Sequence, residues 1–333
     1  MTRHDLKGLV AMLDPYAKPP AAFREIYKRL QKLSVVDISN ESAIVDLQAL
    51  GQTSESRVRE ASRHTLYPMS PEAFGEFTGT RCETTKAFTV YEVSDLPGLF
   101  IYPDLLPRDI QLQILAKTFH RDLSDPQHLT NVHTHYDVPT TSARSSYFSP
   151  AAQGLIFSPR DPAIHKPITT QQFLDKKLRW MTLGGQYDWT NKVYPAGLPP
   201  PFPSDIKQLI ESLFPMKAEA AIVNLYSPGD TLSLHRDVSE ECDQPLASIS
   251  LGCEGIFLVG LDDGCAVTLR LRSGDAVLMS GESRFAWHGV PKVVADTCPE
   301  WMQDWPAGGG QFEEWRGWMA GKRINLNVRQ MFE

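Results

Sequence analysis

The stretch RINLNVR (323–329) decides the fold class, because its side chains alternate with a period of two. Isoleucine, leucine and valine occupy positions 324, 326 and 328, whereas arginine or asparagine occupies positions 323, 325, 327 and 329. This alternation is typical of a β-strand whose two faces meet different surroundings. The polar face lies either in water or inside a barrel, where buried guanidinium groups need an anion such as a dicarboxylate.

Further short, β-branched segments precede this strand at 219–226, 247–260, 266–281 and 285–294. The turn sequences SPGD, LDDG and SGD separate them, which indicates an antiparallel barrel or sandwich. We therefore expect a mainly β fold with flanking helices (α+β), whose core occupies residues 218–333. A tryptophan-rich insertion at 299–322 interrupts this core and is expected to hold a short helix, Gln311–Ala320.

The first two thirds of the chain are expected to surround the core. Residues 1–95 are predicted as a helical extension packed on it, with an amphipathic helix at Ala21–Leu33 and a loop or frayed helix at 51–64. Residues 96–217 are predicted as an outer layer of strands and helices, including a strand within 98–107, a helix at Arg108–Phe119 and long loops over 120–170. No linker separates these parts, which favours one domain.

The stretch NLYSPGDTLSLHRD (224–237) carries the first candidate metal ligands. His235 and Asp237 lie two residues apart, so on an extended chain their side chains point the same way. His288 follows within a later strand-like segment, FAWHGV. Two imidazoles and one carboxylate can bind one face of an octahedral Fe(II), leaving three positions for a cosubstrate and O₂. The alternative for His288 is a core histidine beside Trp287.

Two other histidine motifs are weaker candidates. An earlier HRD at His120–Asp122 is similar to a kinase catalytic loop, but Gln127 occupies the position of the metal-binding asparagine and no glycine-rich phosphate loop precedes it. His133 and His135 lie in an irregular segment without an evident further ligand, where a surface loop is the alternative to a metal site.

The order of these motifs resembles the AlkB family of Fe(II)- and 2-oxoglutarate-dependent dioxygenases. The resemblance implies a double-stranded β-helix (jelly roll) core, with Fe(II) as metal and 2-oxoglutarate and O₂ as cosubstrates. It implies that His235, Asp237 and His288 are the iron ligands. The residues that it implies contact 2-oxoglutarate are Asn224, Tyr226, Arg323, Asn325 and Arg329.

Four further segments are most similar to the eukaryotic AlkB homologue 1 subfamily: HRDVSE (235–240), 178–195, 199–206 and FREIYKRLQ (23–31). Bacterial repair members carry a second acid where this chain has Ser239. The resemblance implies an oxidative demethylase of nucleic acid that releases formaldehyde, succinate and CO₂. It favours N1-methyladenosine in tRNA, with N6-methyladenine in DNA as a second candidate. The alternatives are a hydroxylase or demethylase of a protein such as a histone, and a non-catalytic jelly-roll binding module.

Substrate residues are expected between the outer layer and the core. A base-modifying enzyme holds the flipped base against aromatic side chains, and Trp180, Tyr187 and Trp189 are candidates for this stacking, with ordinary packing as the alternative. Ser239 lies next to the metal motif. A basic patch offers phosphate contacts or a solvated face, and it consists of Lys176, Lys177, Arg179 and Lys192.

Composition restricts the cellular setting. The 333 residues carry a net charge of −7, which argues against a protein that coats DNA through a general positive field. Residues 201–333 hold 11 Lys+Arg against 19 Asp+Glu, so the acidic excess belongs to the expected core. Long apolar runs, a secretory signal and CxxC motifs are absent. We expect an intracellular monomer without membrane contact, in nucleus or cytoplasm, with the mitochondrion as an alternative.

Overall fold

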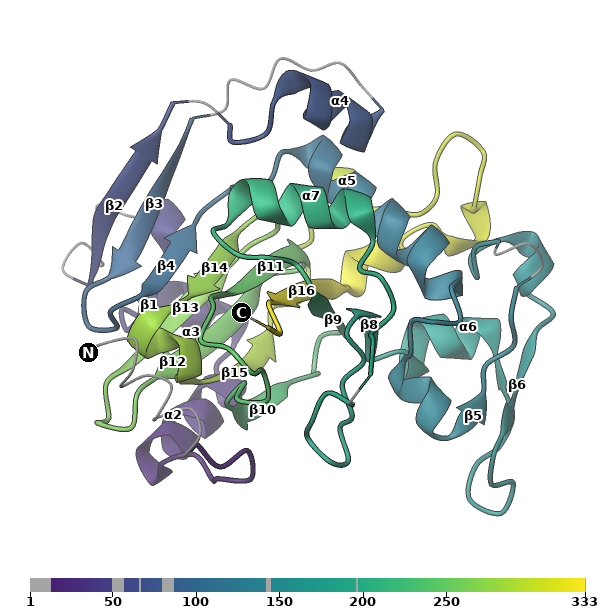
Figure 1. Ribbon diagram of the computed structural model, residues 1–333, viewed down its shortest axis with the longest axis horizontal. Helices are drawn as coiled ribbons and strands as arrows, with labels where there is room; N and C mark the ends of the chain where they lie inside the picture. The colour runs from purple at the N-terminus through teal and green to yellow at the C-terminus, as the bar shows by residue number, and fades with distance from the viewer. Residues whose placement is uncertain are drawn as a thin grey trace.

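Two β-sheets form the core of the computed structural model, which describes residues 13–49, 57–65, 67–79, 87–141, 145–195 and 197–332 (Figure 1). The larger sheet has eight strands, in the order β2 (Val58–His64), β3 (Phe88–Val93), β4 (Leu99–Tyr102), β14 (Ala276–Met279), β11 (Leu246–Gly252), β16 (Arg323–Arg329), β9 (Ala220–Tyr226) and β8 (Trp180–Gly184).

The smaller core sheet has five strands, in the order β1 (Ile44–Val45), β13 (Ala266–Leu271), β12 (Gly255–Gly260), β15 (Trp287–Val293) and β10 (Leu232–His235). From β9 onward the chain passes repeatedly between the two sheets: β9, β11, β14 and β16 belong to the larger one, whereas β10, β12, β13 and β15 belong to the smaller one. This antiparallel alternation is the expected jelly-roll topology. It places strands that are distant in sequence on the two walls of one interior.

The strand predicted from 323–329 lies near the middle of the larger sheet. It pairs antiparallel with β11 on one side and with β9 on the other, over all seven residues in each case. All seven residues of β16 are buried, so neither of its faces meets bulk water. The water-exposed alternative for its polar side chains is therefore excluded.

Helices cover both core sheets. Near one face of the larger sheet lie α4 (Pro71–Thr78), α5 (Arg108–Ala116) and α7 (Ser204–Leu213), as Figure 1 shows. The amphipathic segment forms α2 (Ala21–Lys32), which buries Phe23 and Leu30 and packs against β12 and β15. The next helix is α3 (Val35–Asn40), whose first turn is capped by Ser34. The strand β15, which carries His288, is thus backed by the N-terminal part of the chain.

A third, small sheet lies beside the core. It consists of β5 (Tyr136–Asp137), β6 (Ile156–Pro159) and β7 (Ile168–Thr169), and it is followed by the short helix α6 (Thr170–Gln172). Residues 120–170, predicted as loops, therefore contain these strands between their irregular turns. Within the described ranges no helix is both long and apolar enough to cross a membrane.

Several local predictions are wrong or incomplete. The extension 1–95 contributes β1, β2 and β3 besides its helices, so calling it helical is incomplete. Within 51–64, the part from residue 58 onward is a strand, while 51–56 lie outside the described residues. The helix predicted at Gln311–Ala320 does not form: two 3₁₀ turns stand there, separated by Gly317 with φ of 82°. A left-handed residue ends a helix, which explains the interruption.

The tryptophan-rich insertion begins with α8 (Glu300–Gln303), and several of its tryptophans pack in a small aromatic core. Trp318 contacts Phe119, Phe148 and Trp305 with ring centroids 5.1 to 5.7 Å apart. The first HRD motif supplies His120, whose ring stacks on Phe312 at 4.7 Å. His120 therefore belongs to this packing rather than to a catalytic loop.

Candidate active site

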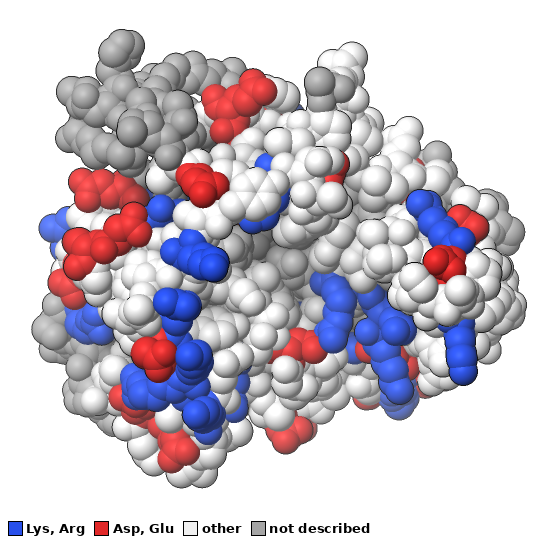
Figure 2. All heavy atoms as spheres, turned by 90° about the horizontal axis from the view of Figure 1, so that it is seen from below, with Lys and Arg blue, Asp and Glu red and all other residues white. Residues whose placement is uncertain are grey.

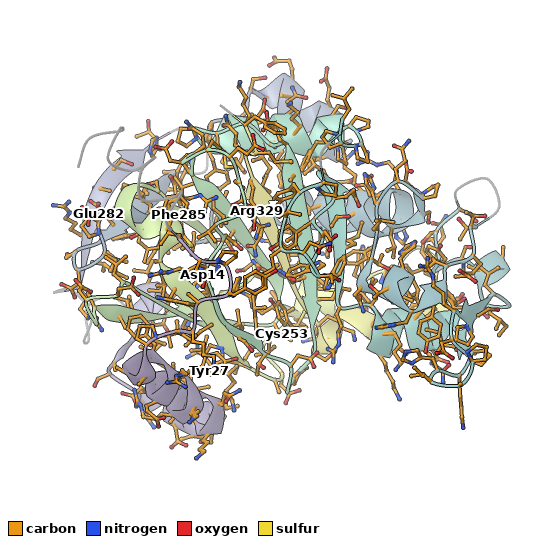
Figure 3. All side chains as sticks on the ribbon, turned by 60° about the horizontal axis from the view of Figure 1, so that its bottom comes forward. Asp14, Tyr27, Cys253, Glu282, Phe285 and Arg329 are labelled. Atoms are coloured by element: carbon orange, nitrogen blue, oxygen red, sulfur yellow. The ribbon has the colours of Figure 1, made fainter. Side chains whose placement is uncertain are left out.

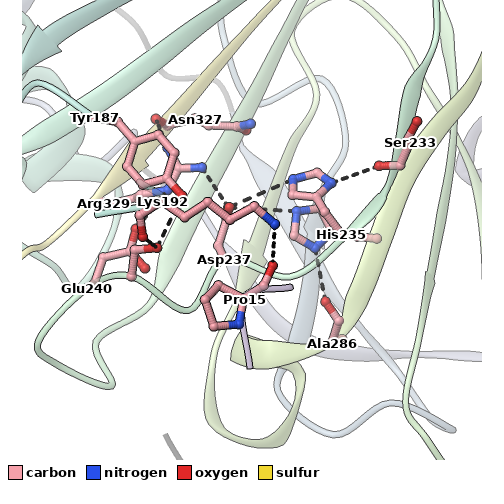
Figure 4. A network of polar contacts seen from close by, with 12 residues as sticks. Pro15, Tyr187, Lys192, Ser233, His235, Asp237, Glu240, Ala286, Asn327 and Arg329 are labelled. Carbon is pink, nitrogen blue, oxygen red and sulfur yellow. Dashed lines mark hydrogen bonds and ion pairs between the residues drawn. The ribbon is translucent and has the colours of Figure 1, made fainter. Parts of the chain in front are cut away.

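The second HRD motif and His288 meet across two neighbouring strands. His235 at the end of β10 lies directly opposite His288 of β15. Asp237 follows two residues later, and its carboxylate oxygens lie 3.8 Å from Nε2 of His235 and 3.7 Å from Nε2 of His288. The three ligand atoms lie within 4.8 Å of one another. Figure 4 shows His235 and Asp237 turned toward each other.

The backbone orients both imidazoles for metal binding. Nδ1 of His235 lies 2.9 Å from the carbonyl oxygen of Ser233, and Nδ1 of His288 lies 3.0 Å from that of Ala286. A carbonyl can only accept, so each Nδ1 carries the proton and each Nε2 lone pair faces the centre. Burial lowers the pKa of His288 to about 4, so this ring is neutral at pH 7, as a ligand must be. The donor set fits Fe(II).

Asp237 is kept ionised by its neighbours. Burial alone raises the pKa of its carboxyl, but Arg329 and the two imidazoles outweigh burial and hold this pKa well below its usual range. Nη2 of Arg329 donates to Oδ2 of Asp237 at 2.6 Å. A carboxylate that is charged before metal arrives needs no proton loss on binding.

A buried charge network supports the turn that follows Asp237. Glu240 forms an ion pair with Nε of Arg329 at 3.1 Å and accepts a hydrogen bond from Nη2 of Arg284 at 3.0 Å. Arg284, only 1% exposed, also donates to the carbonyl oxygens of Asp237 and Gln244, each at 2.8 Å. The buried Arg284 side chain thus holds both ends of the segment 237–244 through hydrogen bonds to their carbonyl oxygens. Sequence reasoning missed it, because no motif or spacing marks an isolated arginine.

The polar face of β16 lines the interior from the opposite sheet. Its four polar side chains are 1 to 7% exposed, and they are Arg323, Asn325, Asn327 and Arg329. On the neighbouring strand β9, Tyr226 lies opposite Arg323 and Asn224 lies opposite Asn325. All five residues predicted to contact 2-oxoglutarate therefore share one wall.

Several polar atoms on this wall lack partners among the described residues. They are the hydroxyl of Tyr226, Nε and Nη1 of Arg323 and Oδ1 of Asn327, all of which are buried. Such atoms are expensive in a folded protein unless a ligand satisfies them. A carboxylate placed at Arg323 would accept from the guanidinium and from the tyrosine hydroxyl. Asn327 was not among the predicted contacts, although it lies on the same strand face.

The two arginines serve opposite ends of the interior. Arg329 lies against Asp237 at the metal end, whereas Arg323 lies six residues away beside Tyr226. Gly255 leaves room for Arg323, since a Cβ added there would lie 2.2 Å from its Nε. A guanidinium with two unpartnered nitrogens at a distance from the metal triad suits a dicarboxylate that reaches the metal with its other end.

A cavity of about 210 Å³ opens onto His235 and Asp237. Among the predicted substrate residues, Tyr187, Trp189 and Ser239 line it. The rings of Tyr187 and Trp189 meet edge to face at 4.8 Å, and the Tyr187 hydroxyl lies 3.2 Å from Oγ of Ser239. The cavity therefore has an aromatic wall with a neutral hydroxyl pair near the metal end.

Lys192 of the predicted basic patch also lines this cavity, whereas the other predicted substrate residues do not. Trp180 lies behind Trp189, with ring centroids 5.3 Å apart. Lys176 and Lys177 end a π-helical turn before β8. Figure 2 shows Lys and Arg side chains in separate groups around a central hollow of mostly uncharged residues. Cavity residues that sequence reasoning missed are Pro15, Tyr194, Ile222, Leu232, Ser233, Arg236 and Glu240.

Comparisons with known proteins agree with this geometry. The model of the 2OG-Fe(II) oxygenase superfamily matches residues 98–329. The N6-methyladenosine RNA demethylase ALKB1 of Pyricularia oryzae is 43% identical, over 96% of this chain and 98% of its own. The corresponding ALKBH protein of Cryphonectria parasitica is 50% identical over 60% of this chain and 99% of its own. The tRNA demethylase abh1 of Schizosaccharomyces pombe is 37% identical over 80% and 88%.

Proposed function

Because the chain belongs to the 2OG-Fe(II) oxygenase superfamily and, within it, to the AlkB family, we propose that it oxidatively demethylates N-methylated bases in nucleic acid. Membership makes it an Fe(II)- and 2-oxoglutarate-dependent dioxygenase, as the sequence predicted. The observation that carries the proposal is that the His235–Asp237–His288 triad and the incompletely paired guanidinium of Arg323 lie in one interior.

We assign the two cofactor roles to these groups. His235, Asp237 and His288 would hold Fe(II), with the imidazole orientation set by backbone carbonyls. Arg323 and Tyr226 would bind the distal carboxylate of 2-oxoglutarate, and Asn224 and Asn325 would flank it. When bound, Fe(II) supplies O₂ activation, which couples the oxidation of 2-oxoglutarate to succinate and CO₂ with hydroxylation of a methyl C–H bond.

The residues around the cavity would position the methylated base. Tyr187 and Trp189 supply the apolar surface against which a flipped base packs. Arg329 keeps Asp237 charged and in place while the methyl group faces the metal end. After hydroxylation, the C–N bond breaks with its electron pair left on the nitrogen, the hydroxyl proton passes to that nitrogen or to solvent, and formaldehyde leaves. The overall change consumes one 2-oxoglutarate and one O₂ per methyl group.

Similarity of sequence supports a more specific substrate. The relatives at 43% and 50% identity are named as N6-methyladenosine RNA demethylases, and the one at 37% as a tRNA demethylase. We therefore propose methylated adenine in RNA as substrate. N1-methyladenosine in tRNA stays the specific prediction, and N6-methyladenine in RNA and in DNA is tested beside it.

The first experiment separates metal chemistry from fold. Asp237→Ala is expected to abolish formation of succinate from 2-oxoglutarate, because the charged ligand is lost. Asp304→Ala is the matched control, since this carboxylate is exposed in the tryptophan-rich insertion. Succinate formation by Asp237→Ala at the wild-type rate would overturn the metal assignment. Failure of the wild-type protein to bind Fe(II) or Mn(II) would favour the non-catalytic binding module.

The second experiment tests the substrate. The protein is incubated with transfer RNA and with DNA oligonucleotides that contain N1- or N6-methylated adenine, and in parallel with methylated histone peptides. Loss of the methyl group is followed by mass spectrometry. We expect loss of 14 mass units, about one CH₂, from nucleic acid together with stoichiometric formaldehyde. Activity confined to the peptides would refute nucleic-acid demethylation and establish the protein hydroxylase alternative.

A further inference from the structure

A short segment near the N-terminus forms part of the cavity wall, although it lies outside the region shared by the superfamily. Pro15 lines the cavity that contains His235 and Asp237, while the superfamily match begins only at residue 98. Figure 4 shows Pro15 in front of Asp237 and beside Lys192, and Figure 3 shows Asp14 between α2 and the interior strands. We call residues 14–17 the strap.

Lys192 fastens the strap to the aromatic side of the cavity. Its ammonium donates to the carbonyl oxygen of Pro15 at 2.6 Å and lies 4.1 Å from the centre of the Tyr16 ring. The hydroxyl of Tyr16 donates to the carbonyl oxygen of Asn191 at 3.4 Å. A charge-assisted hydrogen bond and a cation–π contact thus converge on one side chain.

The strap has its own local structure. Asp14 accepts the backbone N–H of Tyr16 on its carboxylate at 2.8 Å and that of Ala17 on its carbonyl at 3.1 Å, which makes a tight turn. Pro15 and Tyr16 are exposed, and the Tyr16 side chain retains 59% of its accessible surface. Little apolar burial therefore holds the strap in place, so its position depends on the contacts to Lys192.

We call the contacts of Lys192 with Pro15 and Tyr16 the clasp. At the Lys192 end of the clasp, neighbouring contacts hold the backbone in place. Lys192 has φ of 55°, a left-handed conformation that costs energy for a residue with a Cβ. This conformation is held by the backbone pairing of Asp188 with Val193 and by Oγ of Ser239, which donates to the carbonyl oxygen of Lys192 at 2.9 Å. Ser239 also contacts the hydroxyl of Tyr187. A continuous chain of contacts runs from the strap to the aromatic wall.

We propose that the strap is a wall of the nucleotide pocket and that Lys192 is the positioning residue that keeps this wall closed over the methylated base. The inference rests on the function proposed above and adds a specificity element outside the shared fold. With the clasp intact, Pro15 narrows the cavity opposite Tyr187, so a flipped base is confined between them. Without the clasp, the pocket widens and the base is held less well.

A different role for Lys192 makes a different prediction. Sequence reasoning counted it among four phosphate-contacting side chains, and a phosphate contact would lower the salt slope of binding by about one unit when removed. A clasp whose charge is already engaged by Pro15 and Tyr16 leaves the salt slope unchanged. The salt dependence of oligonucleotide binding therefore separates the two roles.

The experiment compares Lys192→Met, Tyr16→Ala and the double variant with wild type. The probe is single-stranded RNA with one N6- or N1-methyladenosine, followed by fluorescence anisotropy and by demethylation kinetics. We expect KM and Kd for the oligonucleotide to rise about tenfold in each single variant and no further in the double variant, because both remove one clasp. Lys192→Arg should restore most of the affinity, since it keeps donor and charge.

Two controls exclude general damage. Succinate formation without oligonucleotide, and the KM for 2-oxoglutarate, should remain at wild-type values in both single variants. Lys207→Met removes a lysine from α7, away from the cavity, and should change nothing. Equal losses in uncoupled succinate formation and in demethylation would show a merely structural role and overturn the proposal.

The remaining outcomes are also decisive. Wild-type protein that binds and demethylates the oligonucleotide, with both variants unaffected, overturns the clasp and leaves the proposed function intact. A shallower salt slope in Lys192→Met but not in Tyr16→Ala assigns Lys192 to phosphate contact instead. Wild-type protein that forms succinate but binds neither oligonucleotide refutes the proposed function and, with it, a nucleotide wall.

Discussion

Replacing Arg323 with methionine should stabilise the protein without its cosubstrate and destabilise it relative to wild type when the cosubstrate is present. Arg323 is 1% exposed, and burial lowers the pKa of its guanidinium. Two of its three nitrogens have no partner among the described residues, and the third donates to Oγ of Ser250 at 3.1 Å. The protein therefore carries a buried, incompletely paired cation in the absence of a ligand.

The magnitude follows from these contacts. Unpaired buried donors on a charged group cost about 1–3 kcal/mol, and the Ser250 hydrogen bond returns about 1 kcal/mol. Methionine fills a similar volume without polar atoms, so Arg323→Met should gain up to about 2 kcal/mol of unfolding free energy. For a chain of 333 residues this corresponds to a rise in Tm of a few degrees, at about 2 °C per kcal/mol.

When 2-oxoglutarate is present, wild type should be more stable than Arg323→Met. At a concentration of 100 Kd, 2-oxoglutarate stabilises wild type by about 2.7 kcal/mol, because it binds only the folded state. Arg323→Met lacks the anchor for the distal carboxylate and should lose this shift. The assay is thermal unfolding with Mn(II) in place of Fe(II), with and without 2-oxoglutarate, in both proteins.

A matched control uses an arginine whose charge is already paired. Arg272 donates to both carboxylate oxygens of Asp46, so Arg272→Met should lower the Tm equally with and without 2-oxoglutarate. A Tm of Arg323→Met below wild type in the absence of 2-oxoglutarate would refute the uncompensated cation. A retained 2-oxoglutarate shift in that variant would refute the assignment of the distal carboxylate site.

Three further predictions test the surroundings of the site. Arg284→Met should weaken Mn(II) binding about 10- to 100-fold in calorimetry, because the segment after Asp237 loses its anchor; wild-type affinity would contradict this. Gly255→Ala should raise the KM for 2-oxoglutarate while Mn(II) affinity stays unchanged, since the added Cβ displaces Arg323; an unchanged KM would show that the guanidinium can shift freely. Burial lowers the pKa of His120 from 6.5 to about 4, so its stabilising neutral form is complete above pH 6.5 and is lost as pH falls toward 4. His120→Gln should therefore reduce the stability difference between pH 7 and pH 4.5 by about 1–2 kcal/mol in urea unfolding, after allowance for solvent near a partly buried ring; an unchanged difference would place the acid sensitivity elsewhere.

Residues with a strong periodic pattern could be assigned from sequence, because the pattern is a direct consequence of burial. The alternation in 323–329 is that of a strand between two packed surfaces, and β16 has these bounds. The same holds for α2, whose apolar stripe faces β12 and β15. By contrast, β2 reads VREASRH and buries only Val58. A polar edge strand carries no burial pattern, so nothing distinguishes it from a loop.

The residues of the candidate site likewise divide into those that could be predicted from sequence and those that could not. The triad and the β16 arginines could be proposed because their side chains are unusual at those positions and their spacing follows strand geometry. Pro15 and Arg284 could not, because their roles arise only when distant segments meet: Pro15 from the strap and Arg284 from the turn before β15. Both act through contacts between segments that are distant in sequence, and such contacts leave no periodic pattern in the sequence.

The distribution of charge now has a structural explanation. Residues 201–333 have 11 basic against 19 acidic side chains, and several of these few arginines point inward: Arg284 and Arg329 hold Glu240 and Asp237, and Arg323 faces the interior. The surface of the barrel is thereby left with an excess of acid. Since a polyanion needs cations on its path, the proposed nucleic-acid contact falls to the preceding segments. A strap from this N-terminal part closing the pocket of an acidic barrel follows the same division, in which the barrel performs the chemistry and the extension selects the nucleotide.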